Sequence, residues 1–219
     1  IWCCLSKPDF EVKKIEFAPA IKNGFVTFGC FNNLYKLNEK VINLWAKILD
    51  SVPNSRLILK NSMLKNKHIK KKIIDQFEKY KINIEKLVLE KGSSRKELLE
   101  SYNKIDITLD PFPYSGGTSS FESIWMAVPV LTKKGSKFIS CTAESINRNM
   151  GMSDWIANDE NEYIIKAIEF SRNLKQLSKI KKKLILVTPE SPLFNASLFA
   201  EQFKNLILQI WEKFNNKNI

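Results

Sequence analysis

Short apolar runs alternate with amphipathic stretches along most of this chain. Asn38 can cap a helix that repeats Val41, Leu44, Trp45 and Ile48 on one face. Further helices are expected after residue 60 to about 80, from Ser94, and over residues 118–126. Beyond residue 132 the chain is expected to be mostly helical, with a long amphipathic helix over residues 197–214. Five short β-forming runs predict strands at residues 25–31, 56–60, 86–90, 105–110 and 128–132.

The alternation of strands and helices indicates an α/β fold. Strand–helix–strand units build a parallel sheet with helices on both faces, and right-handed crossovers place all strand-to-helix loops along one edge. Ligands of such sheets bind at that edge. Here we expect it to consist of residues 32–37, 91–94 and 111–117. Residues 1–24 show no clear periodicity, so we expect a linker from an upstream lobe, with residues 25–219 forming one lobe.

The composition is that of an ordinary globular protein, with 44% hydrophobic and 26% charged residues, and it has no apolar run long enough to span a bilayer. The chain begins at Ile1, so we expect it to be part of a longer protein. The spacing gives no metal site, because His68 is the one histidine and no CxxC pair occurs among Cys3, Cys4, Cys30 and Cys141. Scattered cysteines favour a reduced, cytoplasmic protein.

The net charge of +12 raises the question of nucleic-acid binding. The lysines concentrate in residues 65–72 (KNKHIKKK) and 175–183 (KQLSKIKKK), which are helical, polar stretches without interleaved aromatic residues. Solvated helix faces explain such runs best, and an anionic substrate or a membrane surface is the remaining alternative. We therefore rank a nucleic-acid-binding domain last among the functions considered.

Residues 111–125 (PFPYSGGTSSFESIW) carry the strongest local signal for chemistry. Gly116 and Gly117 would let the backbone approach a ligand closely, and the helix from Thr118 would offer unpaired N–H groups and its positive dipole end. Thr118 and Ser119 would add hydroxyl donors, and Glu122 could accept from ribose hydroxyls. Such a turn can hold a diphosphate. The alternative is a plain turn with Thr118 as an N-cap.

Four other residues are expected at the same edge. Asn33 and Lys36 lie in the first strand-to-helix loop, where Lys36 could reach a phosphate as a point charge. Lys60 ends the second strand, and Arg95 follows the third. Each alone is more simply a solvated side chain, but their convergence with the glycine turn favours a phosphate site.

Several nucleotide and hydrolase motifs are missing. The sequence contains no GxxxxGK[ST], which excludes a P-loop NTPase, and no GxGxxG after its first strand, which disfavours ordinary dinucleotide binding. It has neither a DxD nor a GxSxG motif, so it shows no ligand set for metal-dependent sugar transfer and no hydrolase elbow.

Four segments resemble the C-terminal catalytic lobe of the O-linked N-acetylglucosamine transferase family, especially its bacterial, tetratricopeptide-linked and SPINDLY-like members. They are residues 25–36 (FVTFGCFNNLYK), 52–60 (VPNSRLILK), 105–132 (IDITLDPFPYSGGTSSFESIWMAVPVLT) and 191–195 (SPLFN). The resemblance implies a Rossmann-like lobe, the second of a two-lobed GT-B glycosyltransferase that needs no metal. It also implies an upstream catalytic lobe and tetratricopeptide repeats in the full-length chain.

The resemblance also implies roles for single residues. Lys36 would contact the donor diphosphate and stabilise the leaving group, with Asn33 beside it. Thr118 and Ser119 match a Thr pair at the phosphates, and Glu122 matches the acidic residue at the ribose. Arg95 falls beside the base. The co-substrate would be UDP-N-acetylglucosamine or another nucleotide sugar, with no other cofactor, and the acceptor a protein Ser or Thr; the general base would lie outside this chain.

Three positions depart from the family pattern. Leu98 stands where many members carry a His that stacks on uracil, Gly117 where animal members carry another His, and Cys141 where an Arg is frequent. The departures leave UDP and GDP both open as the donor nucleotide. They also motivate an alternative function, a degenerate lobe that binds a nucleotide sugar or a partner without catalysis.

Overall fold

The computed structural model of the protein describes residues 2–216 and contains one parallel six-stranded sheet in the order β3-β2-β1-β4-β5-β6. This order reverses direction between β1 and β4, as in Rossmann folds. The strands are β1 (Val26–Cys30), β2 (Ser55–Asn61), β3 (Leu87–Lys91), β4 (Ile107–Leu109), β5 (Val130–Lys133) and β6 (Ile156–Ala157). The five predicted strands are confirmed, and each of their ends differs from the predicted one by one or two residues.

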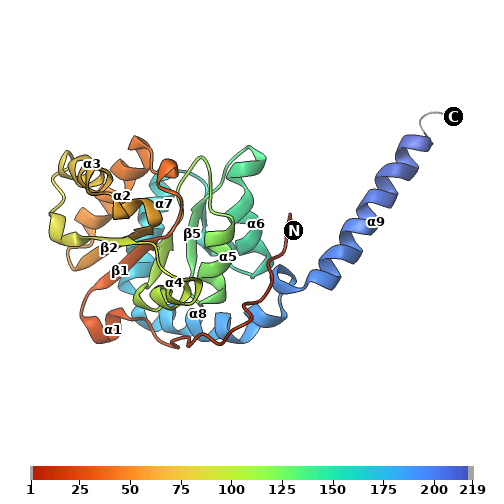
Figure 1. Cartoon of the computed structure of the whole chain (residues 1–219), viewed down its shortest axis with the longest axis horizontal. Helices are drawn as coiled ribbons and strands as arrows, with labels where there is room; N and C mark the ends of the chain where they lie inside the picture. Colours follow the sequence, from red (N-terminus) through yellow and green to blue (C-terminus); the bar gives the residue numbers. More distant parts are fainter. Residues whose placement is uncertain (1, 217–219) are drawn as a thin grey trace.

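Helices cover both faces of the sheet (Figure 1). Successive residues of a strand point to opposite faces, and in β2 the neighbours Leu57 and Ile58 belong to two separate apolar clusters. The Leu57 cluster includes residues of α2, α3 and α7, and the Ile58 cluster includes residues of α4. The helices are α1 (Ala20–Asn23), α2 (Glu39–Ser51), α3 (Lys67–Glu78), α4 (Arg95–Ser101), α5 (Thr118–Trp125), α6 (Thr142–Asn149), α7 (Glu160–Arg172), α8 (Leu174–Val187) and α9 (Ala196–Asn215).

Helix α2 illustrates how the sequence sets a local structure. Its N-cap is Asn38, whose side chain accepts a hydrogen bond from the backbone N–H of Val41 at 3.1 Å. The predicted apolar face is buried, and Trp45 lies at its centre, where the indole N–H donates to the Tyr163 hydroxyl of α7 at 3.4 Å. The helix therefore packs by the stripe that the periodicity indicated.

The two ends of the chain differ in how they meet this body. Residues 2–18 form neither helix nor strand, but they pack along the lobe: Leu5 N–H donates to the Leu193 carbonyl at 2.9 Å, and Ala18 is fully buried. Helix α9, close to its predicted bounds, extends away from the body (Figure 1) and none of its residues is buried. Within residues 2–216, no helix is both long and apolar enough to cross a bilayer.

The chain beyond β5 is mostly helical, as expected, and the two-residue strand β6 that it also contains pairs with β5. One expectation from the pattern needs correction. The second lysine run is not wholly solvated, because Lys181 is fully buried. It lies one turn from Leu177 and Leu184 on the inward face of α8, and its ammonium is 3.5 Å from the Ile105 carbonyl.

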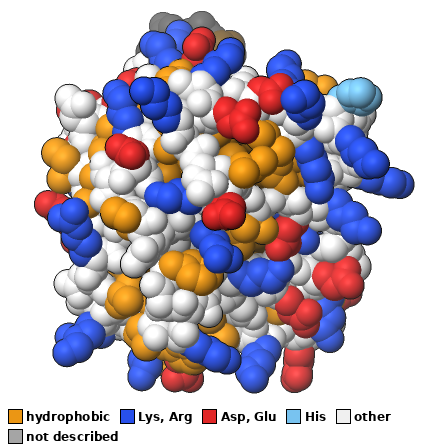
Figure 2. Space-filling view, turned by 90° about the vertical axis from the view of Figure 1, so that its left-hand side faces the viewer, with side chains coloured by type: hydrophobic (Ala, Val, Ile, Leu, Met, Phe, Trp, Pro, Cys, Tyr) orange, Lys and Arg blue, Asp and Glu red, His pale blue; other side chains and the backbone are white. Residues whose placement is uncertain are grey.

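Burial also lowers the pKa of Lys181 to about 8, and Asp106 opposes this shift. Over much of the face drawn in Figure 2, Lys and Arg side chains lie among Asp and Glu, and several gather beside the histidine at the upper right.

Gly29, in the middle of β1, is required by packing. A Cβ at this position would collide with the Ile105 side chain, whose Cγ2 would be 3.0 Å away. We expect Gly29→Ala to lower the free energy of unfolding by about 1–3 kcal/mol, as overpacking does. In Gly29→Ala/Ile105→Val the loss should be less than the sum of the two single losses, measured by denaturant unfolding. Additive losses would contradict this account.

Candidate functional site

A cavity of about 870 Å³ opens where the strand order reverses, between the loops that follow β1 and β4. This is where open parallel sheets bind ligands, and the volume suits a nucleotide-sized molecule. The β1 loop, the β4 loop and the start of α5 supply most of the wall. The lining residues are Trp2, Phe31, Asn32, Asn33, Tyr35, Lys36, Asn38, Leu98, Pro113, Tyr114, Gly117, Thr118, Ser119, Glu122, Phe138, Ile139 and Thr142.

Lys36 lies at the centre of the polar part of this cavity. Its ammonium donates to the Asn32 side-chain oxygen at 3.1 Å and to the Ser115 carbonyl at 2.9 Å, and it lies 4.0 Å from the centre of the Tyr114 ring. Burial lowers the pKa of Lys36, and the charge of Asp110 partly opposes that shift. The ammonium is thus held by neutral groups at the wall of an open cavity.

The start of α5 faces the same space. Its N-cap is Gly117, which has no side chain, so no side chain caps the first N–H groups of the helix. Thr118 is the first helical residue, so its interpretation as an N-cap is wrong. The Ser119 hydroxyl donates to the Asn32 side-chain oxygen at 2.8 Å. Free backbone donors and the positive end of the helix dipole therefore face the cavity.

A buried carboxylate shapes the turn before α5. Asp110 ends β4 and is fully buried; one of its oxygens accepts from the Gly116 N–H at 2.6 Å and the other from the Thr132 hydroxyl at 2.7 Å. Burial raises the pKa of Asp110 to about 6, although these hydrogen bonds favour the charged form. A Cβ on Gly116 would collide with Ser120 and would lie 2.8 Å from the carboxylate.

Gly116 therefore has a different place from the one expected. It packs against Asp110 and is not part of the cavity wall, whereas Gly117 is. A Cβ on Gly117 would meet the Trp2 ring at 3.5 Å. The N-terminal segment thus fills the space beside the position where animal family members carry a histidine side chain. Trp2 could not be selected from the sequence, because its contact depends on the path of an irregular segment.

Glu122 contributes to the wall from one turn inside α5, but most of it is buried. It is 5% exposed, pairs with the Arg95 guanidinium, and accepts from the Tyr102 hydroxyl at 3.4 Å. Burial raises the pKa of Glu122, and Arg95 opposes the shift. Arg95 does not line the cavity itself and acts on it through this pair.

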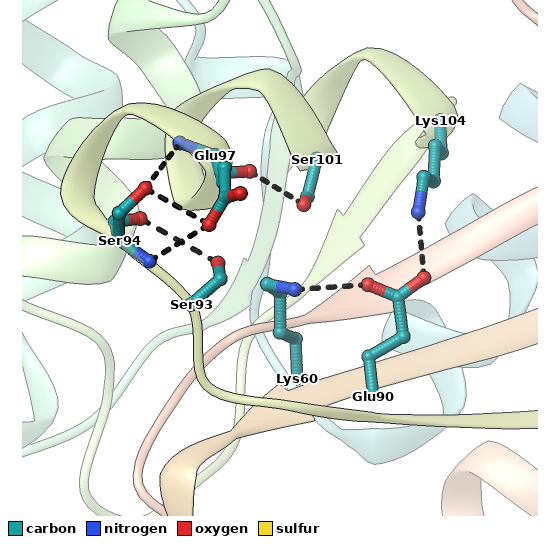
Figure 3. Close-up of polar contacts among 7 residues, drawn as sticks. All are labelled: Lys60, Glu90, Ser93, Ser94, Glu97, Ser101 and Lys104. Carbon is teal, nitrogen blue, oxygen red and sulfur yellow. Dashed lines mark hydrogen bonds and ion pairs between the residues drawn. The ribbon is translucent and has the colours of Figure 1, made fainter.

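Lys60 lies away from the cavity. It is 7% exposed, and its ammonium pairs with one oxygen of Glu90 in β3 at 3.1 Å, while Lys104 takes the other oxygen at 2.7 Å (Figure 3). The same view shows the capping box that starts α4, in which Ser94 and Glu97 exchange hydrogen bonds. The structure thus brings Asn33, Lys36, Gly117, Thr118, Ser119 and Glu122 together in the cavity wall, but not Lys60, Gly116 or Arg95.

Asn32, Tyr114 and Thr142 line the cavity although the sequence reasoning did not select them. Thr142, at the start of α6, donates to the Gly116 carbonyl at 3.0 Å and so fixes the glycine turn from outside. Tyr114 lies within the motif and could have been chosen. Thr142 could not, because only the folded chain brings α6 to the turn.

Cys141 and Leu98, two of the departures from the family pattern, have distinct surroundings. Leu98 lines the cavity and packs with the Ile58 cluster. An aliphatic side chain therefore stands where the family pattern has a histidine ring. Cys141 is half-buried, and its thiol donates to the Gly135 carbonyl at 3.1 Å.

Comparisons with known proteins agree on one family. The model of glycosyl transferase family 41 matches residues 19–203. A probable UDP-N-acetylglucosamine–peptide N-acetylglucosaminyltransferase SPINDLY from Solanum lycopersicum is 32% identical over 208 residues, which are 94% of this chain and 22% of that protein. The Caenorhabditis elegans UDP-N-acetylglucosamine–peptide N-acetylglucosaminyltransferase is 23% identical and covers 86% of this chain. The chain therefore spans only part of these relatives, 22% of the SPINDLY protein and 16% of the nematode protein.

Solved structures extend the similarity to the fold. A mutant O-GlcNAc transferase of Thermobaculum terrenum superposes with a TM-score of 0.77 at 32% identity, covering 82% of this chain and 34% of the other. TarM of Staphylococcus aureus has a TM-score of 0.65 at 13% identity over 92% of this chain and 38% of the other, a likeness of fold alone. The expected fold class, a Rossmann-like lobe of a GT-B glycosyltransferase, is confirmed, and this chain belongs to glycosyl transferase family 41.

Proposed function

We propose that this chain is the donor-binding lobe of an enzyme that transfers N-acetylglucosamine from UDP-N-acetylglucosamine to Ser or Thr of a protein. The names of the SPINDLY and nematode relatives support this choice of donor and acceptor. We place the acceptor contacts and the general base in another lobe of a longer protein, joined to tetratricopeptide repeats. The free thiols of Cys3, Cys4, Cys30 and Cys141 support a cytoplasmic location.

The surroundings of Lys36 carry the proposal. The Lys36 ammonium lies at the wall of an open cavity, and the groups that contact it, a side-chain amide oxygen, a backbone carbonyl and an aromatic ring, are all neutral, so its charge can pair with an anionic ligand. The third ammonium proton and the free N–H groups of α5 can converge on one phosphate. We propose that these groups hold the donor diphosphate without a metal ion.

In the transfer step the bond between the sugar C1 and the β-phosphate oxygen breaks as the acceptor oxygen attacks C1 from the opposite face, and the acceptor's proton passes to the general base of the other lobe. Negative charge then grows on the departing diphosphate. A fixed cation and fixed N–H donors stabilise that charge more than the charge of the bound donor, because they need no reorganisation during the reaction. Lys36 and the start of α5 would therefore lower the barrier by stabilising the leaving group.

Lys36→Ala tests this assignment. Removing one charge-assisted hydrogen bond to phosphate should weaken UDP binding by roughly tenfold to a hundredfold. The loss should be clearly smaller for UMP, which lacks the β-phosphate, and both are measured by calorimetry on this chain. The matched control is Lys71→Ala in α3, which removes the same charge from an exposed position paired with Asp75 and should leave both affinities unchanged. Equal losses for UDP and UMP would place Lys36 away from the β-phosphate.

Leu98 favours a second function, a lobe that binds the nucleotide weakly and does not catalyse. The residue gives the cavity an aliphatic wall where a ring would stack on the base. Stacking on an aromatic ring is worth roughly 1–3 kcal/mol per base. Leu98→His should therefore tighten UDP binding by about tenfold, with Leu98→Ala as the control that opens the same space without a ring.

Titrations of the same variants with UDP and GDP give the measurement. If Leu98→His binds neither nucleotide more tightly than Leu98→Ala, the base lies elsewhere in the cavity. Preferential tightening of one nucleotide identifies the donor base. Turnover of UDP-N-acetylglucosamine by the full-length protein separates the transferase from the non-catalytic lobe.

A further inference from the structure

Two asparagines follow β1, and the structure gives them different tasks. The side-chain oxygen of Asn33 accepts from the Tyr35 N–H at 3.0 Å and caps the short helical turn Leu34–Lys36. Asn32 is only 4% exposed and lines the cavity beside Lys36. The sequence pattern pointed to Asn33, but the buried contacts single out Asn32.

The side-chain oxygen of Asn32 joins two parts of the site. It accepts from the Lys36 ammonium at 3.1 Å and from the Ser119 hydroxyl at 2.8 Å. Lys36 fixes the orientation of the amide, because an ammonium can only donate and the amide nitrogen would oppose it. One oxygen therefore ties the cation of the β1 loop to the first turn of α5.

The nitrogen of the Asn32 amide, in contrast to the oxygen, makes no such contact. It is buried and has no hydrogen-bond partner among the residues that the structure describes. The nearby Cys30 thiol, whose pKa burial raises to about 12 and the Asn32 side chain lowers slightly, offers at most a weak acceptor. Leaving an amide N–H unpaired is unfavourable, so the favourable side-chain hydrogen bonds of Asn32 are those of its oxygen.

The pairing also changes the expected role of Ser119. Its hydroxyl proton is directed to Asn32 and not to the cavity. What α5 offers a ligand is then its backbone N–H groups and the Thr118 hydroxyl, while the Ser119 hydroxyl fixes the helix relative to Lys36. The remaining ammonium proton of Lys36 is left for the ligand, since the other two are bound by Asn32 and Ser115.

We propose that Asn32 is the positioning residue that holds the Lys36 ammonium at the N-terminus of α5, so that both grip the same phosphate of a nucleoside diphosphate. The inference rests on the proposed function for its ligand. Asn32 need not touch the ligand, because it acts through Lys36. Without Asn32, Lys36 keeps its charge but loses its fixed place.

A double-mutant cycle tests the coupling on this chain. Asn32→Ala should weaken UDP binding by about tenfold in the wild-type background and by about twofold or less when Lys36 is already Ala. The control is Asn66→Ala, which removes one N-cap bond of α3 at 2.8 Å, to the His68 N–H, far from the cavity lining, and should leave the affinity unchanged. Equal losses in both backgrounds, or no loss in either, would overturn the inference.

A ligand-free measurement separates this inference from the proposed function. In lysine-labelled protein, the ¹⁵N ammonium signal of Lys36, assigned by its absence in Lys36→Ala, should be visible in the wild type because its protons exchange slowly. It should persist in Asn32→Asp, which keeps an acceptor oxygen, and disappear in Asn32→Ala. An unchanged signal in Asn32→Ala would show that Asn32 does not fix the Lys36 ammonium and would refute this inference. If the wild-type chain shows the signal but binds neither UDP nor GDP, the proposed function is refuted instead.

Discussion

The parallel pairing of β1 with β4 is the constraint on which the site depends. Phe28 lies opposite Ile107 and Gly29 opposite Thr108, although three helices and two strands, α2 to α4 with β2 and β3, separate the two strands in sequence. Strands β2 and β3 lie on one side of this pair, and β5 and β6 lie on the other. The loops that leave β1 and β4 therefore diverge and leave a crevice between them. Gly29 permits the close packing of Ile105, and the first loop carries Lys36 while the second leads into α5.

Buried charges around the crevice are compensated in different ways. Asp110 is satisfied by a backbone N–H and a hydroxyl, which rigidify the glycine turn. Glu122 is paired with Arg95. Lys36 contacts neutral groups only, so it is the charged side chain of the cavity wall best suited to an incoming anion. The charges of an ion pair within the protein already compensate each other, whereas a cation with neutral partners can still pair with an anionic ligand.

The family similarity and the local physics support each other without being the same argument. The match to glycosyl transferase family 41 covers most of the chain but only about a fifth of its SPINDLY relatives. It defines the family of the chain and the fold of the lobe. The hydrogen bonds of Asn32 and Asp110 show how this particular chain builds the lobe's polar wall, including the turn where Trp2 packs beside Gly117.

The sequence alone determined the alternating strands, the capped helix after Asn38 and the glycine turn before α5, because periodicity, caps and turns are local properties. It also placed Lys36, Thr118 and Ser119 on one edge, since the crossover rule needs only the order of elements. It could not show that Lys60 is bound by Glu90, that Gly116 serves Asp110, or that Lys181 is buried. Those outcomes depend on which distant side chains meet, and only the tertiary structure decides such contacts. The choice of Asn32 over Asn33 is of the same kind, because adjacent residues of one type differ only in the direction that the folded backbone gives them.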